Sequence, residues 1–183
     1  MADISDPIKP LLLADLLRQG LHQGQKSQLE VSSNSMAPLL RRGDRVILEA
    51  VTPEQLAPGD VITLADLTGI TTHRYWSKTA VTDPPRLLTR GDRPLVFDPP
   101  WPPEALVGRM VGRSRRTKSL WVTSGAGRLL NRHLCWLAKR EFQWWGHRVD
   151  GAAPIRRAWL RRWLRGAIYA WATIFAGILS LIG

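Results

Sequence analysis

One stretch of the sequence decides how the chain is expected to fold: Ser32-Ser33-Asn34-Ser35-Met36-Ala37-Pro38-Leu39-Leu40-Arg41-Arg42-Gly43-Asp44-Arg45-Val46-Ile47-Leu48. It starts as a serine-rich loop, passes through a proline and a Gly-Asp turn, and ends in a short apolar run. The run over 46–48 is β-prone, so the stretch predicts a loop followed by a strand. A serine on such a loop is either an ordinary turn former or a positioned nucleophile, and this stretch alone leaves both open.

The sequence on either side of this strand consists of short β-prone runs separated by Gly and Pro turns. A second Gly-Asp turn leads into the run at 61–64, and the run at 69–76 is rich in β-branched and aromatic residues. Further runs lie at 86–92 and 106–112. Because no long helical pattern interrupts them, they predict a mainly β, barrel-like domain over 28–115.

Helical patterns flank this domain. Leucines at helical spacing within 1–27 predict an amphipathic helix that packs on the domain, with a membrane-surface helix as the alternative. Its apolar run is too short to span a bilayer, and it lacks the features of a secretory signal. A basic amphipathic segment rich in Trp follows the domain over 116–153, with its helix at 125–145.

The last segment, 154–183, combines an arginine- and tryptophan-rich start with eighteen residues that carry no charge. As a helix these eighteen residues would be about 27 Å long, slightly less than a hydrocarbon core of about 30 Å. Interfacial Trp and nearby Arg are typical of attachment to an anionic membrane. The segment therefore predicts a C-terminal membrane anchor, by a span or a steeply inserted helix; the alternative is a helix packed against protein.

Composition narrows the partners and cofactors. The net charge is +11, and the chain has nine Trp but a single cysteine, Cys135. This charge favours an anionic partner, and the mixture of Arg and Trp fits a lipid interface better than nucleic acid. One cysteine excludes an internal disulfide. His133 and His147 have no Cys or carboxylate partners at metal spacing, and no phosphate-binding glycine loop occurs, so we expect no metal or other cofactor.

His73 and two carboxylates supply what a nucleophilic serine needs. A hydroxyl does not react at neutral pH without a base, and His73 is the histidine within 28–115. Asp92 and Asp98 follow, and either could orient an imidazole as the third member of a triad does. Each residue also has an ordinary interpretation, as a half-buried strand histidine or as turn and loop aspartates.

The order and spacing of these motifs over 31–112 resemble those of the signal peptidase I family of serine peptidases. The motifs are Ser-Met-x-Pro-x-Leu with Gly-Asp, then Pro-Gly-Asp-Val, His-Arg, Gly-Asp with a second Asp six residues on, and Val-Gly-Arg. The resemblance implies a signal-peptidase/LexA-like, β-barrel-type catalytic domain, here followed by a helical, Trp/Arg-rich C-terminal extension. It also implies cleavage of a leader or signal-type segment from a peptide or protein precursor.

The same resemblance implies a role for each candidate residue. Ser35 would be the nucleophile, and His73 its base, as in the endoplasmic-reticulum and archaeal branch of the family. Asp98 would orient His73, and Asp92 would be a supporting carboxylate. The backbone N–H of Ser35 and the hydroxyl of Ser33 would form the oxyanion hole.

The chain departs from the family pattern in some places. The usual Gly-Asp-Asn reads Gly-Asp-Arg-Pro at 91–94, the apolar segment follows the serine instead of preceding it, and the chain beyond residue 113 has no counterpart. Arginines at 156–165 place the β-domain in the cytoplasm by the positive-inside tendency, whereas the resemblance implies the opposite side, so the side stays open. Two alternatives remain, a non-catalytic membrane-bound binding or assembly module and a cytoplasmic self-cleaving regulator.

Overall fold

The structure is a computed structural model of the whole chain, and it describes residues 8–79, 84–94, 96–145 and 158–182. Within these ranges a sheet is formed by β1 (Ser27–Glu30), β2 (Arg45–Glu49), β3 (Val61–Asp66), β4 (Gly69–Lys78), β5 (Leu87–Arg90), β6 (Leu106–Arg115) and β7 (Lys118–Trp121). The α-helices are α1 (Ile8–His22), α2 (Gly125–Trp145) and α3 (Ala158–Ile182), and short 3-10 helices are η1 (Pro53–Gln55) and η2 (Pro103–Ala105).

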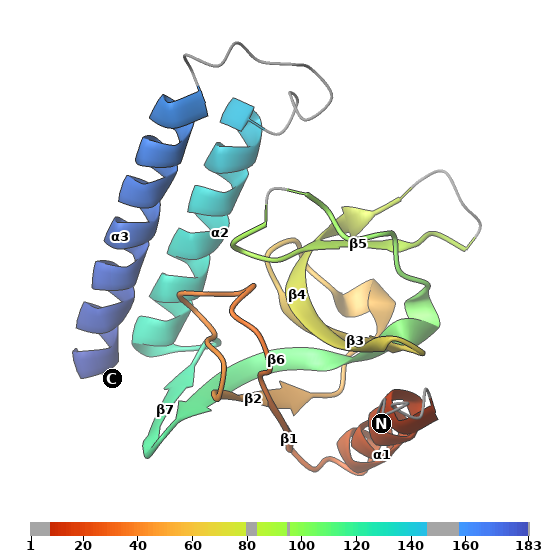
Figure 1. Cartoon of the computed structure of the whole chain (residues 1–183). Coiled ribbons are helices and arrows are strands. Elements are labelled where there is room, and N and C mark those ends of the chain that lie inside the picture. The colour runs from red at the N-terminus through yellow and green to blue at the C-terminus, as the bar shows by residue number, and fades with distance from the viewer. Residues whose placement is uncertain (1–7, 80–83, 95, 146–157, 183) are drawn as a thin grey trace, which may run out of the picture.

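The sheet is antiparallel throughout, and strands that follow one another in the chain are not always neighbours. The strand order is β1-β2-β6-β3-β4-β5, and β7 pairs with β6 beside this path. The long strand β6 pairs in different parts of its length with β2, β3 and β7, and it crosses the centre of Figure 1. Because β1 and β5 end the order, the sheet is open within the described residues.

The mainly β class predicted from the sequence is confirmed, as one antiparallel sheet with a few helices. One strand was not predicted: β7 lies within 116–153, which the sequence indicated to be helical. The turn before β7 has Arg116 at a positive φ of 54°, where Gly or Asn is usual. The hairpin therefore lacks the turn signal that would have revealed it.

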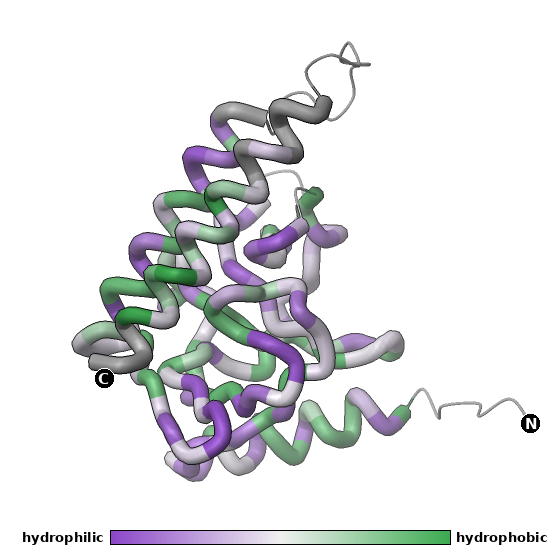
Figure 2. Tube along the Cα trace, turned by 60° about the vertical axis from the view of Figure 1, so that its left-hand side comes forward, coloured by the Kyte–Doolittle hydropathy of each residue, from purple (hydrophilic) through white to green (hydrophobic). Residues whose placement is uncertain are grey.

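Helix α1 packs on the sheet through Ala14, Leu17 and Leu21, which are buried in the main core. A Cβ added at Gly108 of β6 would lie 2.9 Å from a Leu21 methyl carbon and 2.8 Å from the Glu49 carbonyl oxygen. Glycine at this position thus permits the close approach of the helix. Four apolar side chains of α1 are nevertheless exposed: Ile8, Leu12, Leu13 and Leu16. Hydrophobic and hydrophilic colours alternate along this helix, which is the one next to the N-terminus in Figure 2.

Helices α2 and α3 lie side by side as an antiparallel pair beside the sheet (Figure 1). The helix predicted at 125–145 matches α2. Leu130 and Leu134 of α2 join the same core as Ala172 and Ala176 of α3, so the pair is packed onto the domain. The other side of α3 exposes large apolar side chains: Trp163, Trp171, Ile174 and Ile178.

The structure bears only partly on the predicted anchor segment, 154–183. Among the described residues, no helix combines the length and apolar character that crossing a membrane requires. Residues 146–157, which include His147 and the first arginines of the segment, lie outside the described residues. Membrane attachment through this segment remains a prediction.

Candidate active site

The loop that carries Ser35 joins β1 to β2 and is fixed by its own buried side chains and by a hydrogen bond between its two ends. Side chains just after the serine are each 2% exposed or less: Met36, Leu39 and Leu40. The side chain of Asn34 accepts a hydrogen bond from the Arg42 N–H at 3.0 Å, which ties the start of the loop to its end. The loop is thus anchored on both sides of the serine, because apolar residues follow it and a polar tie precedes it.

The segment after β5 packs against the backbone of Ser35. The Arg93 N–H donates to the Ser35 carbonyl oxygen at 2.8 Å. A Cβ added at Gly91 would lie 3.0 Å from the same oxygen and 2.8 Å from Cδ of Pro94. Because no side chain fits at this point, Gly91 permits the close approach that positions the serine.

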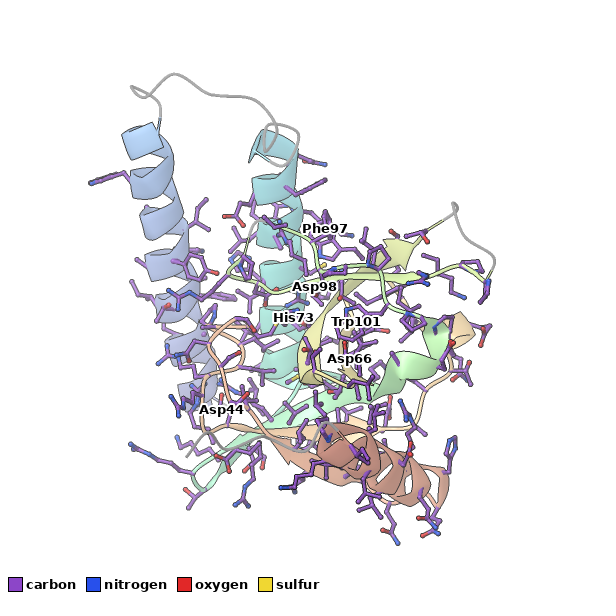
Figure 3. All side chains as sticks on the ribbon, turned by 45° about the vertical axis from the view of Figure 1, so that its right-hand side comes forward. Asp44, Asp66, His73, Phe97, Asp98 and Trp101 are labelled. Atoms are coloured by element: carbon purple, nitrogen blue, oxygen red, sulfur yellow. The ribbon has the colours of Figure 1, made fainter. Side chains whose placement is uncertain are left out.

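His73 lies in the middle of β4, paired with Ile62 of β3, and contacts both predicted partners. Its Nε2 is 2.9 Å from Ser35 Oγ, and its Nδ1 is 2.6 Å from Asp98 Oδ2. A carboxylate only accepts hydrogen bonds, so Nδ1 carries the proton and Nε2 is free to accept from the serine hydroxyl. The imidazole side chain is 12% exposed, and Figure 3 shows His73 next to Asp98.

Asp98 is held by a residue that the sequence did not single out. Thr89, which is fully buried on β5, donates its hydroxyl to Asp98 Oδ2 at 2.6 Å. The Asp98 N–H in turn donates to the Thr89 carbonyl at 2.9 Å. The pair is nine residues apart and joined across a proline-rich loop, so no local pattern could have revealed it. Thr89 fixes the carboxylate that orients His73.

Asp92 lies against Arg74 and not against His73, which answers the question that the sequence left open. Arg74 Nε and Nη2 donate to the two Asp92 oxygens at 2.7 and 2.8 Å. Both side chains are nearly buried, at 1% and 6% exposure. Burial is the largest single influence on the pKa of Arg74 and lowers it, but the charge and hydrogen bonds of Asp92, together with smaller contributions from Cys135 and Asp60, raise that pKa overall. Asp92 is thus the counter-ion of the residue that follows His73.

Arg74 also links the site to α2. Its Nη1 donates to the carbonyl oxygen of Gly59 at 2.8 Å and to Oδ1 of Asn131 on α2 at 2.7 Å. From α3, the hydroxyl of Tyr169 donates to the Asp92 carbonyl at 2.8 Å. The helical pair therefore supports the strand that presents His73.

A buried cation, Arg90, supports the segment that presents Asp98. Aromatic rings surround its guanidinium: Trp76, Phe97 and Phe142. The guanidinium carbon is 4.7 Å from the centre of the Trp76 ring, and it is 5.9 Å from each of the other two centres. Phe97 directly precedes Asp98, and the two are labelled next to each other in Figure 3. This cation–π cluster therefore fixes the backbone that carries the carboxylate.

The two predicted oxyanion donors lie together beside the nucleophile. Ser33 Oγ is 3.2 Å from Ser35 Oγ, and the Ser35 N–H points to Ser33 Oγ at 3.4 Å. A hydroxyl can rotate, whereas the backbone N–H is fixed. In this structure the Ser35 N–H is engaged with Ser33 Oγ, so both donors reach an oxygen that forms next to Ser35 only after the Ser33 side chain turns away from that N–H and toward the new oxygen.

A cleft of about 360 Å³ lies beside Ser35 and His73. One wall is β1 and the chain that follows it, and the other is residues 70–73 of β4. Within the described residues β1 pairs only with β2, and β5 pairs with β4 only from residue 74 onward. Both walls are therefore strand edges. Apolar side chains line much of the cleft: Leu29, Val31, Met36, Leu40 and Ile70.

Comparison with protein-family models, curated proteins and solved structures finds no match to this chain. Its function therefore has to be inferred from the geometry of its own residues. Within the described ranges, no group of three or more His, Cys, Asp or Glu side chains is placed to hold a metal ion. The geometry that remains is a serine, a histidine and an aspartate in hydrogen-bonded series beside an apolar cleft.

Proposed function

We propose that this protein is a membrane-associated serine endopeptidase of the signal peptidase type, which removes a leader or signal-type segment from a peptide or protein precursor. The observation that carries the proposal is the series Ser35 Oγ to His73 Nε2 at 2.9 Å and His73 Nδ1 to Asp98 Oδ2 at 2.6 Å. Three residue types in the order of nucleophile, base and orienting carboxylate are what acyl transfer from a peptide needs.

The proposed reaction begins when Ser35 Oγ attacks the scissile carbonyl carbon and His73 Nε2 takes the hydroxyl proton. Asp98 stabilises the imidazolium that forms. The oxyanion accepts hydrogen bonds from the Ser35 N–H and the Ser33 hydroxyl. His73 then protonates the leaving amine, and water, activated by the same imidazole, hydrolyses the ester on Ser35 and restores the free enzyme.

The proposed substrate is an extended peptide. Because both walls of the cleft are strand edges, a peptide lying between them can bond to either through its backbone. The apolar lining favours uncharged side chains near the cut, and the family resemblance implies small residues before it. We also propose a signal-peptidase-like, barrel-type arrangement for the catalytic domain, on the strength of the motif order over 31–112.

The proposed membrane association rests on exposed apolar surface. The outer face of α3 exposes Trp163 by 72% and Ile174 by 57%. Trp171, whose indole N–H donates to His133 of α2, is also 55% exposed. Tryptophan at such a surface is suited to the boundary between lipid and water, and the net charge of +11 favours anionic headgroups. Through Tyr169 the same helix contacts the backbone of Asp92, next to the segment that holds Ser35.

The test uses purified full-length protein in detergent and a peptide library read by mass spectrometry, together with precursors encoded nearby. Wild type is compared with Ser35→Ala and His73→Ala. Matched controls are Ser77→Ala and His22→Ala, which change exposed residues outside the site. We expect cleavage by wild type and by both controls, and no cleavage by the two site variants. Equal cleavage by all five proteins would rule out the proposed chemistry.

A further inference from the structure

A second cavity, of about 620 Å³, lies between the turn at 41–44 and the β6–β7 hairpin. It shares no lining residue with the cleft beside Ser35. Asp44, which lines it, lies away from His73 and Asp98 and toward that hairpin in Figure 3. The cavity is therefore a separate feature of the molecule, and the proposed peptidase chemistry leaves it unexplained.

Positive charge dominates the lining of this cavity. Its charged side chains are six cations and one carboxylate: Arg41, Arg42, Arg113, Arg115, Arg116, Lys118 and Asp44. Asp44 is already engaged, because Arg115 donates to its two oxygens at 2.6 and 2.7 Å. In the part of the chain that the structure describes, no carboxylate lies within ion-pair distance of four exposed cations: Arg41, Arg42, Arg116 and Lys118.

The buried part of the lining is also electropositive. Arg113 is 3% exposed, and its Nη1 donates to the Leu39 carbonyl oxygen at 2.6 Å. Burial lowers the pKa of Arg113 to about 10; repulsion from Arg115 and Arg41 adds to this effect, and attraction to Asp44 opposes it. One carboxylate therefore does not balance the cations that meet here.

Arg116, in the turn between β6 and β7, has a backbone conformation that glycine adopts more easily. Arg116 has a φ of 54°, in the left-handed region that costs a residue with a Cβ about 1 kcal/mol or more. The side chain it carries is exposed and lines the cavity. The two-residue turn between the paired residues Arg115 and Lys118 requires this conformation, and it places the Arg116 side chain at the cavity.

We propose that this cavity binds a phosphate group carried by a larger organic molecule. Guanidinium groups match phosphate oxygens with paired donors, and several arginines around one cavity favour phosphate over a single carboxylate. The volume of about 620 Å³ exceeds what one phosphate ion fills, so the site has room for the group that bears the phosphate. The phosphate belongs either to a lipid headgroup or to a soluble phosphate ester.

The test uses full-length protein and two measurements. Binding of inorganic phosphate is measured by NMR titration. Binding to phosphatidylcholine vesicles, with and without phosphatidylglycerol, is measured by co-sedimentation. The cavity variant is the triple substitution Arg42→Gln, Arg116→Gln and Lys118→Gln. The control has the same change in net charge on the exposed side of α2: Arg128→Gln, Arg132→Gln and Lys139→Gln. Circular dichroism verifies that both variants are folded.

We expect the cavity variant to bind inorganic phosphate about tenfold more weakly or worse, and the control to bind it like wild type. If the cavity variant also loses the gain in vesicle binding that phosphatidylglycerol gives, the ligand is a lipid headgroup. If that gain is retained, the ligand is a soluble phosphate ester. Equal weakening of phosphate binding in both variants, or no binding by wild type, would overturn the proposal.

Discussion

Thr89 Oγ1 lies 2.6 Å from Asp98 Oδ2, the same carboxylate oxygen that is 2.6 Å from His73 Nδ1. One oxygen therefore accepts two hydrogen bonds, one from a fully buried hydroxyl and one from the imidazole. Because the carboxylate is fixed in this way, the imidazole has a single orientation, which aims Nε2 at Ser35 Oγ. Thr89 acts on the proposed reaction only through Asp98.

Replacing Thr89 with valine keeps the shape of the side chain but removes the donor. We expect kcat to fall about tenfold with little change in KM, because a hydrogen bond to a charged group contributes about 1.5–3 kcal/mol. Thr63→Val is the control: Thr63 is equally buried and bonds Thr72 Oγ1 at 2.9 Å on β3 and β4. Both variants lower the free energy of unfolding, but an equal loss of kcat in both would assign Thr89 a purely structural role.

Asp98→Asn and Asp92→Asn should have different effects. Asparagine at 98 favours the wrong imidazole tautomer, so kcat should fall by about 10³–10⁴ with the unfolding midpoint in urea almost unchanged. Asparagine at 92 leaves Arg74 buried without its counter-ion, which should cost about 3–5 kcal/mol of stability. If Asp92→Asn leaves the urea midpoint unchanged, the role assigned to the Arg74–Asp92 pair is wrong.

Gly91→Ala tests the packing of the segment after β5 against the nucleophile. The new Cβ would lie 3.0 Å from the Ser35 carbonyl oxygen and 2.8 Å from Cδ of Pro94, so one of them has to move. We expect kcat/KM to fall at least about tenfold, since small displacements at a reacting atom reduce rates strongly. Gly166→Ala on α3, where the added Cβ meets no atom within 4 Å, should leave kcat/KM unchanged. An active Gly91→Ala enzyme would argue against this contact.

The contact between α2 and α3 should weaken in acid. Burial lowers the pKa of His133, and its Nε2 accepts a hydrogen bond from Trp171 Nε1 at 3.2 Å. At pH values between the lowered pKa and the ordinary histidine pKa, the unfolded chain binds more protons at this position than the folded protein does. The stability that comes from neutral His133 is therefore complete above the ordinary pKa. It is lost as the pH falls from there toward the lowered pKa.

Unfolding midpoints in urea at neutral and mildly acidic pH measure this effect. Wild type should lose more stability on acidification than His133→Gln, because glutamine can accept the same hydrogen bond but does not titrate. Identical losses in the two proteins would show that His133 does not contribute to the acid sensitivity.

The sequence predicted the order of the site residues, but residue types and spacing left both Asp92 and Asp98 open as the partner of His73, and only the family resemblance favoured Asp98. Both follow the same strand and both are preceded by turn or loop residues. Which aspartate orients His73 depends on Arg74, because this buried residue forms an ion pair with Asp92. Burial of an arginine against an aspartate 18 residues away has no local sequence pattern.

In the fold, too, features that depend on local sequence were predicted, whereas contacts between distant segments were not. The periodicity of the sequence predicted α2 with its observed bounds, because one face is regularly apolar. It did not predict that Asn131 of this helix would bond Arg74, since such a contact depends on how the helix docks. Strand β7 was missed because the turn at Arg116 contains no glycine or asparagine.

The central claim, that Ser35 is a nucleophile, is tested most directly by trapping the acyl-enzyme. A peptide ester of a cleaved sequence is mixed with the protein, the reaction is quenched in acid, and the tryptic peptide 27–41 is analysed by mass spectrometry. We predict an acyl group on Ser35 in wild type, and neither acylation of this peptide nor turnover in Ser35→Ala. Turnover by Ser35→Ala at the wild-type rate, with no adduct on Ser35 in wild type, would contradict the account.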